Sequence, residues 1–197
     1  MRITAGAFKG RRLDTPRGAV TRPTADQVRT ALMDALTPWL EGARLLDLFA
    51  GAGGVGLEAL SRGAEHATFV ERDARAVTAL RGNVAELELE TRARVLREDV
   101  LRALQRLDRE AARFHLVFLD PPYERDLAGP VLAALGAGRL LVPPGIVVAQ
   151  HLTKRPPAPA AGALRAYRTR RFGETTLTFF RPGDYDSGIP SPPTGDC

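Results

Sequence analysis

The sequence predicts an α/β fold on a mostly parallel sheet, and three observations lead to that prediction. Short apolar segments alternate with amphipathic ones along most of the chain, as in strand–helix–strand units. A glycine-rich turn follows the first apolar segment, where such folds pass from strand to helix. Two β-rich runs joined by Phe172-Gly173-Glu174 then indicate an antiparallel hairpin. The 197 residues are enough for one domain with a sizeable core.

The N-terminal region, residues 1–20, contains spaced glycines and alternating polar residues that predict a short hairpin and a loop. Thr24 and Gln27 have the spacing of a capping box, and apolar residues follow at helical intervals. We therefore expect a helix from Ala25 to Thr37 that Pro38 ends. This basic hairpin and lid helix make up a first region, residues 1–37.

The second region, residues 38–181, holds the alternating elements. Periodicity predicts parallel strands over residues 44–49, 67–71, 94–97, 115–120 and 145–150. It predicts the intervening helices over residues 55–62, 74–89, 100–112 and 127–135. The hairpin strands cover residues 164–171 and 175–181, which brings the expected sheet to seven strands, and the proline-rich residues 154–162 predict a loop. Residues 182–197 have almost no apolar content and predict a disordered tail.

Charge is concentrated at the two ends of this plan. The formal net charge is +5, from 28 Lys and Arg against 23 Asp and Glu. Residues 1–30 hold seven basic and two acidic side chains, residues 151–181 hold seven and one, and the middle is slightly acidic. This distribution favours a polyanionic partner that is bound by the ends. Basic charge that merely aids solubility is the alternative.

Several classes of protein are excluded or disfavoured. Cys197 is the single cysteine, so neither an intrachain disulfide nor a thiolate metal cage can form. No apolar run approaches the ~20 residues of a membrane span, and residues 1–12 lack the apolar stretch of a secretory signal. His66, His115 and His151 show no ligand spacing. We expect a cytoplasmic protein without membrane contact and without a metal.

The glycine-rich turn predicts a ligand that carries an adenosine. Gly51, Gly53 and Gly56 satisfy G-x-G-x-x-G between strand and helix, and Glu71 at the end of the next strand can accept both ribose hydroxyls. Asp47 would repel a pyrophosphate, which disfavours a nicotinamide dinucleotide, but it suits an α-ammonium. S-adenosylmethionine has the adenosine and the ammonium and no phosphate.

Carboxylates also follow the third and fourth predicted strands, where open α/β sheets bind ligands. Asp99 could accept from an adenine amine or could cap the next helix, and the sequence leaves both roles open. After the fourth strand, Asp120 and the Pro121 carbonyl would be free acceptors, because the paired Pro121-Pro122 fixes an extended turn. Tyr123 adds a flat face. These groups suit a planar substrate that bears an –NH2.

The motifs at residues 47–53 and 120–123 resemble the cofactor and catalytic motifs of class I S-adenosylmethionine-dependent amino-methyltransferases. Three further segments narrow the resemblance: Met-Arg-Ile-Thr-Ala-Gly-Ala-Phe-Lys-Gly at the N-terminus, Arg-Pro-Thr-x-Asp-x-Val-Arg at residues 22–29, and Phe-Gly-Glu-Thr-Thr-Leu at residues 172–177. Together they are similar to the RsmD family of bacterial 16S rRNA guanine-N2-methyltransferases over residues 1–181. Ala25 and Met33-Asp34 depart from the family pattern. These departures affect the expected details of RNA contact but not the expected class of enzyme.

The resemblance implies a Rossmann-like class I methyltransferase that methylates guanine 966 of 16S rRNA, in an assembled or assembling small subunit, and acts as a monomer. The expected catalytic residues are Asp120, Pro121, Pro122 and Tyr123. The expected S-adenosylmethionine contacts are Asp47, Phe49, Gly51, Gly53, Glu71, Arg72, Asp99 and Val100, with a lid formed by Arg22, Pro23 and Thr24. The expected RNA contacts are Lys9, Arg11, Arg12, Arg29, Arg168, Arg170 and Arg171.

Other functions remain open on sequence alone. An N6-adenine methyltransferase shares the Asp120 motif, although no inserted target-recognition domain is evident in 197 residues. A non-enzymatic RNA-binding assembly factor would keep the basic ends but has no need of the carboxylates. A protein glutamine methyltransferase usually shows Asn in place of Asp120.

Overall fold

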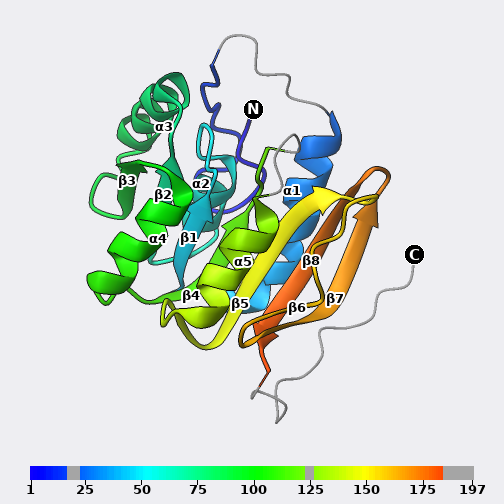
Figure 1. Ribbon diagram of the computed structural model, residues 1–197. Helices are drawn as coiled ribbons and strands as arrows, with labels where there is room; N and C mark the ends of the chain where they lie inside the picture. The colour runs from blue at the N-terminus through cyan, green and yellow to red at the C-terminus, as the bar shows by residue number, and fades with distance from the viewer. Residues whose placement is uncertain (17–22, 123–126, 184–197) are drawn as a thin grey trace.

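A single mixed sheet organises the protein, as the computed structural model of residues 1–16, 23–122 and 127–183 shows (Figure 1). Its strands are β1 (Arg44–Leu48), β2 (His66–Glu71), β3 (Ala93–Arg97), β4 (Phe114–Leu119), β5 (Leu141–Leu152), β6 (Ala160–Ala161), β7 (Leu164–Phe172) and β8 (Thr175–Pro182). The helices are α1 (Pro23–Leu36), α2 (Gly54–Ser61), α3 (Ala74–Glu86), α4 (Val100–Arg109) and α5 (Ala128–Ala137), with a 3-10 turn η1 (Thr37–Trp39) after α1.

The strand order is β3-β2-β1-β4-β5-β8-β7-β6. Strands β1 to β5 pair in parallel, and β8 enters antiparallel between β5 and β7. The predicted α/β class, the parallel sheet and the C-terminal hairpin are therefore confirmed. Because β1 to β5 all run one way, their carboxyl ends meet at one edge of the sheet, where the motif residues lie.

The expected count of seven strands is wrong, because the described residues form eight. The additional strand, β6, lies in residues 154–162, which we expected to be a loop. Ala160 pairs with Arg165 and Ala161 with Leu164, so β6 covers the outer edge of β7. Two residues are too few to produce an alternating pattern, which is why periodicity gave no sign of this strand.

Helices cover both faces of the sheet (Figure 1). Helices α1, α2 and α3 contribute Leu32, Leu57 and Leu80 to the core on one face. Helices α4 and α5 contribute Leu104 and Leu132 to the core on the other. Strands buried on both faces need continuous apolar sequence, and the buried part of β1, residues 45–48, supplies it except at Asp47. Burying a carboxylate in such a strand costs free energy unless hydrogen bonds or a charged partner compensate for it.

The N-terminal arm forms the predicted hairpin as far as it is described. Arg2 and Arg12 form an antiparallel bridge, and Ile3 and Leu13 are both 2% exposed against the core. The fully buried carboxylate of Glu58 on α2 holds the arm by accepting from the Thr4 N–H (2.8 Å) and hydroxyl (2.6 Å). Residues 17–22 of the expected loop, including Arg22, lie outside the described residues.

Helix α1 begins at Pro23, two residues before the expected start, so Thr24 lies inside its first turn instead of preceding it. Proline is favoured at the first helical position because its missing N–H is not needed there. Pro38 falls in η1, which ends the helix as expected. The predicted tail lies outside the described residues from position 184 on. No helix in the described ranges has the length and apolar character needed to cross a bilayer.

Candidate active site

The end of β1 places a buried carboxylate under the glycine-rich turn. Asp47 is 1% exposed, and its Oδ2 accepts from the Gly56 N–H of α2 at 2.9 Å. Helix α2 comes this close because Gly56 has no Cβ, which would collide with the ring of Phe69. Burial raises the pKa of Asp47 to about 7, and the nearby Asp120 and Glu71 add to the rise. A cation placed beside Asp47 would be strongly favoured.

The end of β2 holds a carboxylate fixed by main-chain donors. Glu71 Oε1 accepts from the N–H groups of Arg72 (2.7 Å) and Asp73 (2.8 Å), and Oε2 accepts from Gly51 at 2.9 Å. Each carboxylate oxygen has two lone pairs, so Oε2 retains one acceptor site beside the glycine turn. Glu71 can therefore bind a hydroxyl group without first being reoriented.

Asp99 follows β3, and the sequence left two roles open for it: a cap of the next helix and an acceptor for an adenine amine. Its Oδ1 caps α4 by accepting from Leu101 (3.0 Å) and Arg102 (3.4 Å). The other oxygen takes no part in these two bonds, and the residue borders a cavity together with Val100. Capping and ligand contact are thus compatible, because they use different oxygens of one carboxylate.

Asp120 directly follows β4. Burial raises the pKa of this carboxyl to about 7, as it does for Asp47. Its Oδ2 accepts from Nε2 of Gln150 on β5 at 3.2 Å. The paired prolines follow directly, with Pro121 buried and Pro122 exposed. Tyr123, the fourth expected catalytic residue, lies outside the described residues. Asp120 is thus a carboxylate of near-neutral pKa with a single side-chain bond among the described residues.

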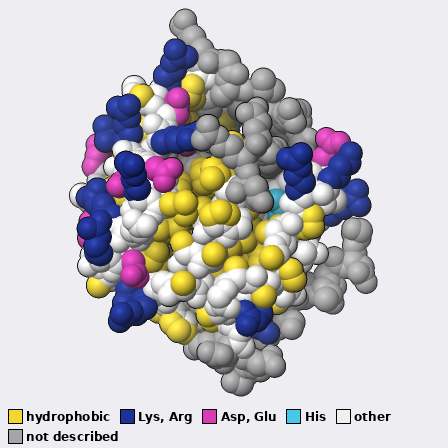
Figure 2. Space-filling model, viewed as in Figure 1, with side chains coloured by type: hydrophobic (Ala, Val, Ile, Leu, Met, Phe, Trp, Pro, Cys, Tyr) yellow, Lys and Arg dark blue, Asp and Glu magenta, His cyan; other side chains and the backbone are white. Residues whose placement is uncertain are grey.

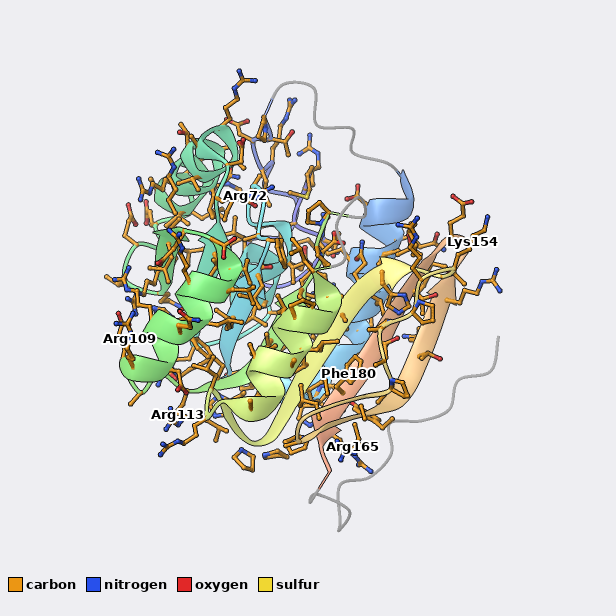
Figure 3. The ribbon with its side chains drawn as sticks, in the orientation of Figure 1. Arg72, Arg109, Arg113, Lys154, Arg165 and Phe180 are labelled. Carbon is orange, nitrogen blue, oxygen red and sulfur yellow. The ribbon has the colours of Figure 1, made fainter. Side chains whose placement is uncertain are left out.

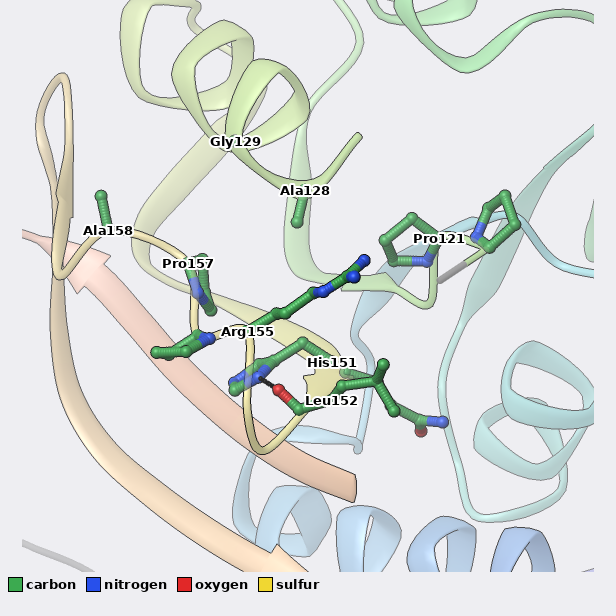
Figure 4. Close-up of a pocket in the computed structure, with 11 residues that line it drawn as sticks. Pro121, Ala128, Gly129, His151, Leu152, Arg155, Pro157 and Ala158 are labelled. Atoms are coloured by element: carbon green, nitrogen blue, oxygen red, sulfur yellow. Dashed lines mark hydrogen bonds between the residues drawn. The ribbon is translucent and has the colours of Figure 1, made fainter. Parts of the chain in front are cut away.

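Among the described residues, Asp120 lines two cavities, and a third is lined by the neighbouring Pro121, Pro122 and Gln150. The glycine-loop cavity, about 340 Å³, is bounded by Asp47, Gly51, Gly54 and Arg29. The strand-end cavity, about 710 Å³, is bounded by Glu71, Asp73, Glu98 and Asp99. The proline cavity, about 510 Å³, is bounded by Pro121, Arg155, Pro156 and Pro157, and the Arg155 side chain extends across it toward Ala128 (Figure 4).

Residues at the ends of β1, β4 and β5 are shared between these cavities. Phe49 and Asp120 border both the glycine-loop and the strand-end cavity, Gln150 borders the glycine-loop and proline cavities, and Pro122 borders the strand-end and proline cavities. Phe49 adopts a positive φ of 62°, a strained conformation for a non-glycine residue. The three spaces therefore meet around Asp120, Pro122 and Gln150, which is where two reactants could be brought together.

Arg29, an expected RNA contact, is 6% exposed and faces the glycine-loop cavity, so its assignment to an RNA-binding surface is wrong. Its helical spacing relative to the buried Val28 and Leu32 indicates the inner face of α1. The RNA assignment relied instead on the number of basic residues in this region. Of the expected lid, Arg22 lies outside the described residues, and Pro23 and Thr24 begin α1. The described arm residues that line the glycine-loop cavity are Met1, Thr15 and Pro16.

The other expected RNA contacts lie in two places. Lys9, Arg11 and Arg12 are exposed at the arm, and Arg11 Nη2 donates to the Glu86 carbonyl at 2.9 Å. Glu86 ends α3, about 18 Å along that helix from the strand-end cavity. Arg11 therefore lies away from the strand-end cavity, whereas Met1, Thr15 and Pro16 of the same arm line the glycine-loop cavity.

On the hairpin, exposed and half-buried residues alternate along β7, so its arginines do not all face one way. Arg168 lies over the Phe179 ring at 5.7 Å, and Arg170 donates to the Ala31 carbonyl of α1 at 3.4 Å. Arg171 is exposed. Basic side chains stand at both ends of the hairpin, as Lys154 and Arg165 show (Figure 3). On the face carrying α4 and α5, hydrophobic side chains gather at the centre and basic ones along the flanks (Figure 2).

The described residues fit S-adenosylmethionine, which is long, cationic and free of phosphate. The glycine-loop and strand-end cavities join at Phe49 and Asp120, so an extended ligand can span both. Gly51, at φ +56°, has no atom within 4 Å of where a Cβ would stand, so a ligand can approach its backbone. Asp47, Glu71 and Asp99 supply acceptors along the same path.

This fold, with its glycine turn and strand-end carboxylates, defines a class I methyltransferase. A solved protein from Thermus thermophilus superposes with a TM-score of 0.77 at 35% identity, covering 91% of this chain and 98% of that one. The family model described as conserved hypothetical protein 95 matches residues 1–181. The chain belongs to this family, the RsmD family of rRNA methyltransferases.

Individual relatives agree with that membership. YlbH of Bacillus subtilis is 38% identical over 92% of this chain and 98% of its own length. The Haemophilus influenzae protein named ribosomal RNA small subunit methyltransferase D is 33% identical over 79% of this chain and 81% of its own. The Thermus thermophilus 16S rRNA N2 G1207 methyltransferase RsmC, solved with AdoMet and guanosine, has a TM-score of 0.68 at 25% identity, covering 84% of this chain and 44% of that one.

Sequence reasoning missed two residues of the site. Gln150 ends the strand predicted at 145–150, and the strand-end argument used for Asp47, Glu71 and Asp120 would have found it. Asn83 on α3 accepts from the Asp14 N–H and donates to the Asp14 and Ala52 carbonyls, so it ties the arm to the glycine turn. No local pattern reveals Asn83, because its partners lie 69 and 31 residues away.

Proposed function

We propose that this protein transfers the methyl group of S-adenosylmethionine to the exocyclic N2 amine of a guanine in 16S rRNA, guanine 966 in the usual rRNA numbering. The observation that carries the proposal is that three cavities share Asp120, Pro122 and Gln150, each of which lines two of the three. Two of them suit the cofactor and the third opens beside Pro121. Relatives named for small-subunit rRNA methylation support the substrate class.

In this proposal the cofactor's adenosine lies in the strand-end cavity and its methionine moiety in the glycine-loop cavity. Glu71 binds the ribose hydroxyls through the free acceptor site on Oε2, and Asp99 accepts from the adenine amine. Asp47 holds the ammonium group. When bound, S-adenosylmethionine supplies a methyl group already activated by the positive sulfonium. The acidic walls therefore favour the cationic cofactor over its neutral-sulfur product.

The substrate base would approach from the proline cavity. Asp120 and the Pro121 carbonyl would accept the two N–H bonds of the amine, which turns its lone pair toward the methyl group. Most of the acceleration would come from this positioning, for which effective molarities of ~10⁵ M or more are attainable. A pKa of about 7 also suits Asp120 to take up the proton that the amine releases. We retain Tyr123 as the stacking partner of the base.

RNA outside the target nucleotide would meet the exposed cations Lys9, Arg11, Arg12 and Arg171, with smaller contributions from Arg168 and Arg170, whose guanidinium groups contact protein. The arm and the hairpin lie on different parts of the molecule. A substrate that contacts both must be large and shaped, as an assembled or assembling small subunit is. We propose that the protein acts on it as a monomer.

The test is mass spectrometry of rRNA nucleosides from a strain that lacks the gene, with the purified protein added back in vitro. The expected result is loss of one N2-methylguanine and its return on incubation with small subunits and S-adenosylmethionine. Retention of every N2-methylguanine in the deletion strain removes the proposal. Recovery of N6-methyladenine in place of N2-methylguanine would assign the protein to the other amine.

A further inference from the structure

Arg29 is a buried cation whose structural partners do not account for its position. It lies on the inner face of α1, is 6% exposed, and lines the glycine-loop cavity opposite the turn. A Cβ on Gly54 would stand 3.6 Å from its Nη1. The guanidinium group therefore lies over the glycine-rich turn, in the cavity that also contains Asp47.

The hydrogen bonds of Arg29 leave part of the guanidinium group unused. Nη1 lies 3.0 Å from Asp26 Oδ1, and Nη2 donates to the Arg2 carbonyl at 2.7 Å. These contacts involve two of the five N–H groups of the side chain. The buried Nε has no hydrogen-bond partner among the described residues. That Nε is closed to the cavity and lies 3.8 Å from Glu58 Oε2, so the donors left for a ligand are the remaining N–H groups of Nη1 and Nη2, where an acceptor would be favoured.

Neutralising Glu58 does not explain the placement of Arg29. Arg29 Nε lies 3.8 Å from Glu58 Oε2, beyond hydrogen-bonding distance. Glu58 already accepts from the N–H and hydroxyl of Thr4, from the Ala5 N–H, and from Arg62 Nε at 3.0 Å. Arg62 thus supplies the paired cation that a buried carboxylate needs.

The cavity therefore presents one anion and one cation to whatever occupies it. Asp47 suits an ammonium group, and a planar guanidinium suits a carboxylate, which it can bind through two parallel N–H bonds. An α-amino acid has both groups on one carbon. We propose that Arg29 binds the α-carboxylate of the methionine moiety while Asp47 binds its ammonium group. This inference rests on S-adenosylmethionine being the cofactor, as proposed above.

The test compares two ligands that share the adenosine and sulfur and differ in the amino-acid end: S-adenosylhomocysteine, which has it, and 5′-methylthioadenosine, which lacks it. Isothermal titration calorimetry gives the dissociation constant of each for the wild type, Arg29→Met and Arg29→Lys. We expect Arg29→Met to weaken S-adenosylhomocysteine about tenfold to hundredfold and to leave 5′-methylthioadenosine within about twofold. Arg29→Lys should show a smaller selective loss, because it keeps the charge but not the planar fork.

Arg62→Met is the matched control, since it removes the other arginine beside Glu58, and Arg62 does not line the glycine-loop cavity. It should leave the ratio of the two dissociation constants unchanged. Equal weakening of both ligands by Arg29→Met, or no weakening, overturns the proposal. Where circular dichroism shows that Arg29→Met is unfolded, the ligand ratio of Arg29→Lys decides in the same way. Failure of the wild type to bind S-adenosylhomocysteine would instead refute the cofactor.

Discussion

The two halves of the strand-end edge are fixed by different kinds of contact. In the half that we propose for the cofactor (the cofactor half), at β1, β2 and β3, main-chain N–H groups hold the carboxylates of Asp47, Glu71 and Asp99. In the half that we propose for the substrate (the substrate half), at β4 and β5, Asp120 is held by the side chain of Gln150, 30 residues away. Main-chain donors cannot swing away, so the cofactor half is preorganised. The substrate half depends on a tertiary contact between two side chains.

The difference gives different freedom to Asp47 and Asp120, the two carboxylates whose pKa burial raises. Both have a pKa near 7, but Asp47 retains a main-chain donor that supports its charged form. For Asp120, burial alone is the cause of the shift. A group that must release and regain hydrogen bonds during a reaction benefits from that looseness. The following experiments would break or sharpen this contrast.

The largest effect is expected from Asp120→Asn, which changes the substrate half alone. We expect methyl transfer to fall by about 10²–10³-fold, because one acceptor for the amine becomes a donor. Binding of S-adenosylhomocysteine should stay within about twofold, since the carboxylates of the cofactor half are untouched. A tritiated-methyl assay on small subunits, with calorimetry alongside, measures both. Turnover comparable to wild type would contradict the role of Asp120.

Glu71→Gln tests the cofactor half next. We expect cofactor affinity to fall about tenfold to hundredfold, because Gln offers one acceptor oxygen where Glu71 uses two for three main-chain donors. Calorimetry with S-adenosylhomocysteine provides the measurement. Glu110→Gln is the control: it neutralises a carboxylate that pairs with Arg94 and Arg106 and lines none of the three cavities, so affinity should stay within about twofold. Unchanged affinity in Glu71→Gln would show that the site does not bind the ribose.

The contrast also explains what the sequence could predict. Glu71 and Asp99 are held mainly by donors one to three residues away, and such local spacing is visible in a sequence. The Gln150–Asp120 bond, the Asn83 bridge and the inward placement of Arg29 arise only when separate elements pack. Charge counting assigned Arg29 to RNA because composition does not encode direction. The parallel direction of β1 to β5 followed from the strand–helix alternation, whereas β6 depends on pairing with β7.

A smaller effect is expected from pH, acting on both halves through Asp47 and Asp120. A cation favours their ionised forms, so cofactor affinity should rise by about tenfold from pH 5.5 to 8 and level off above pH 7. Calorimetry in buffers of different ionisation enthalpy should show proton release on binding below pH 7. Affinity independent of pH would mean that both groups are already ionised without ligand.

The same shifts have a consequence for the unliganded protein. A carboxyl whose folded pKa is raised favours the folded state below its unfolded pKa of about 4, and that contribution is lost as pH rises to about 7. Asp120→Asn cannot ionise, so relative to wild type it should gain about 1–3 kcal/mol between pH 4 and pH 8. Urea denaturation at the two pH values measures this gain. An equal difference at both would place Asp120 in contact with solvent.

The smallest effect separates two arginines of the hairpin, and it extends the contrast to RNA. Arg171 is exposed, whereas the guanidinium group of Arg168 lies over the Phe179 ring. We expect Arg171→Gln to lower the slope of log K against log salt by about 0.7–0.9, the value of one phosphate contact. Arg168→Gln should change that slope less and reduce stability by about 0.5–1 kcal/mol, because it loses the cation–π contact. Fluorescence anisotropy with labelled rRNA across a salt series distinguishes them. If the two variants shift the slope equally, contact with Phe179 does not remove Arg168 from the RNA surface, and the hairpin binds RNA through both of its faces.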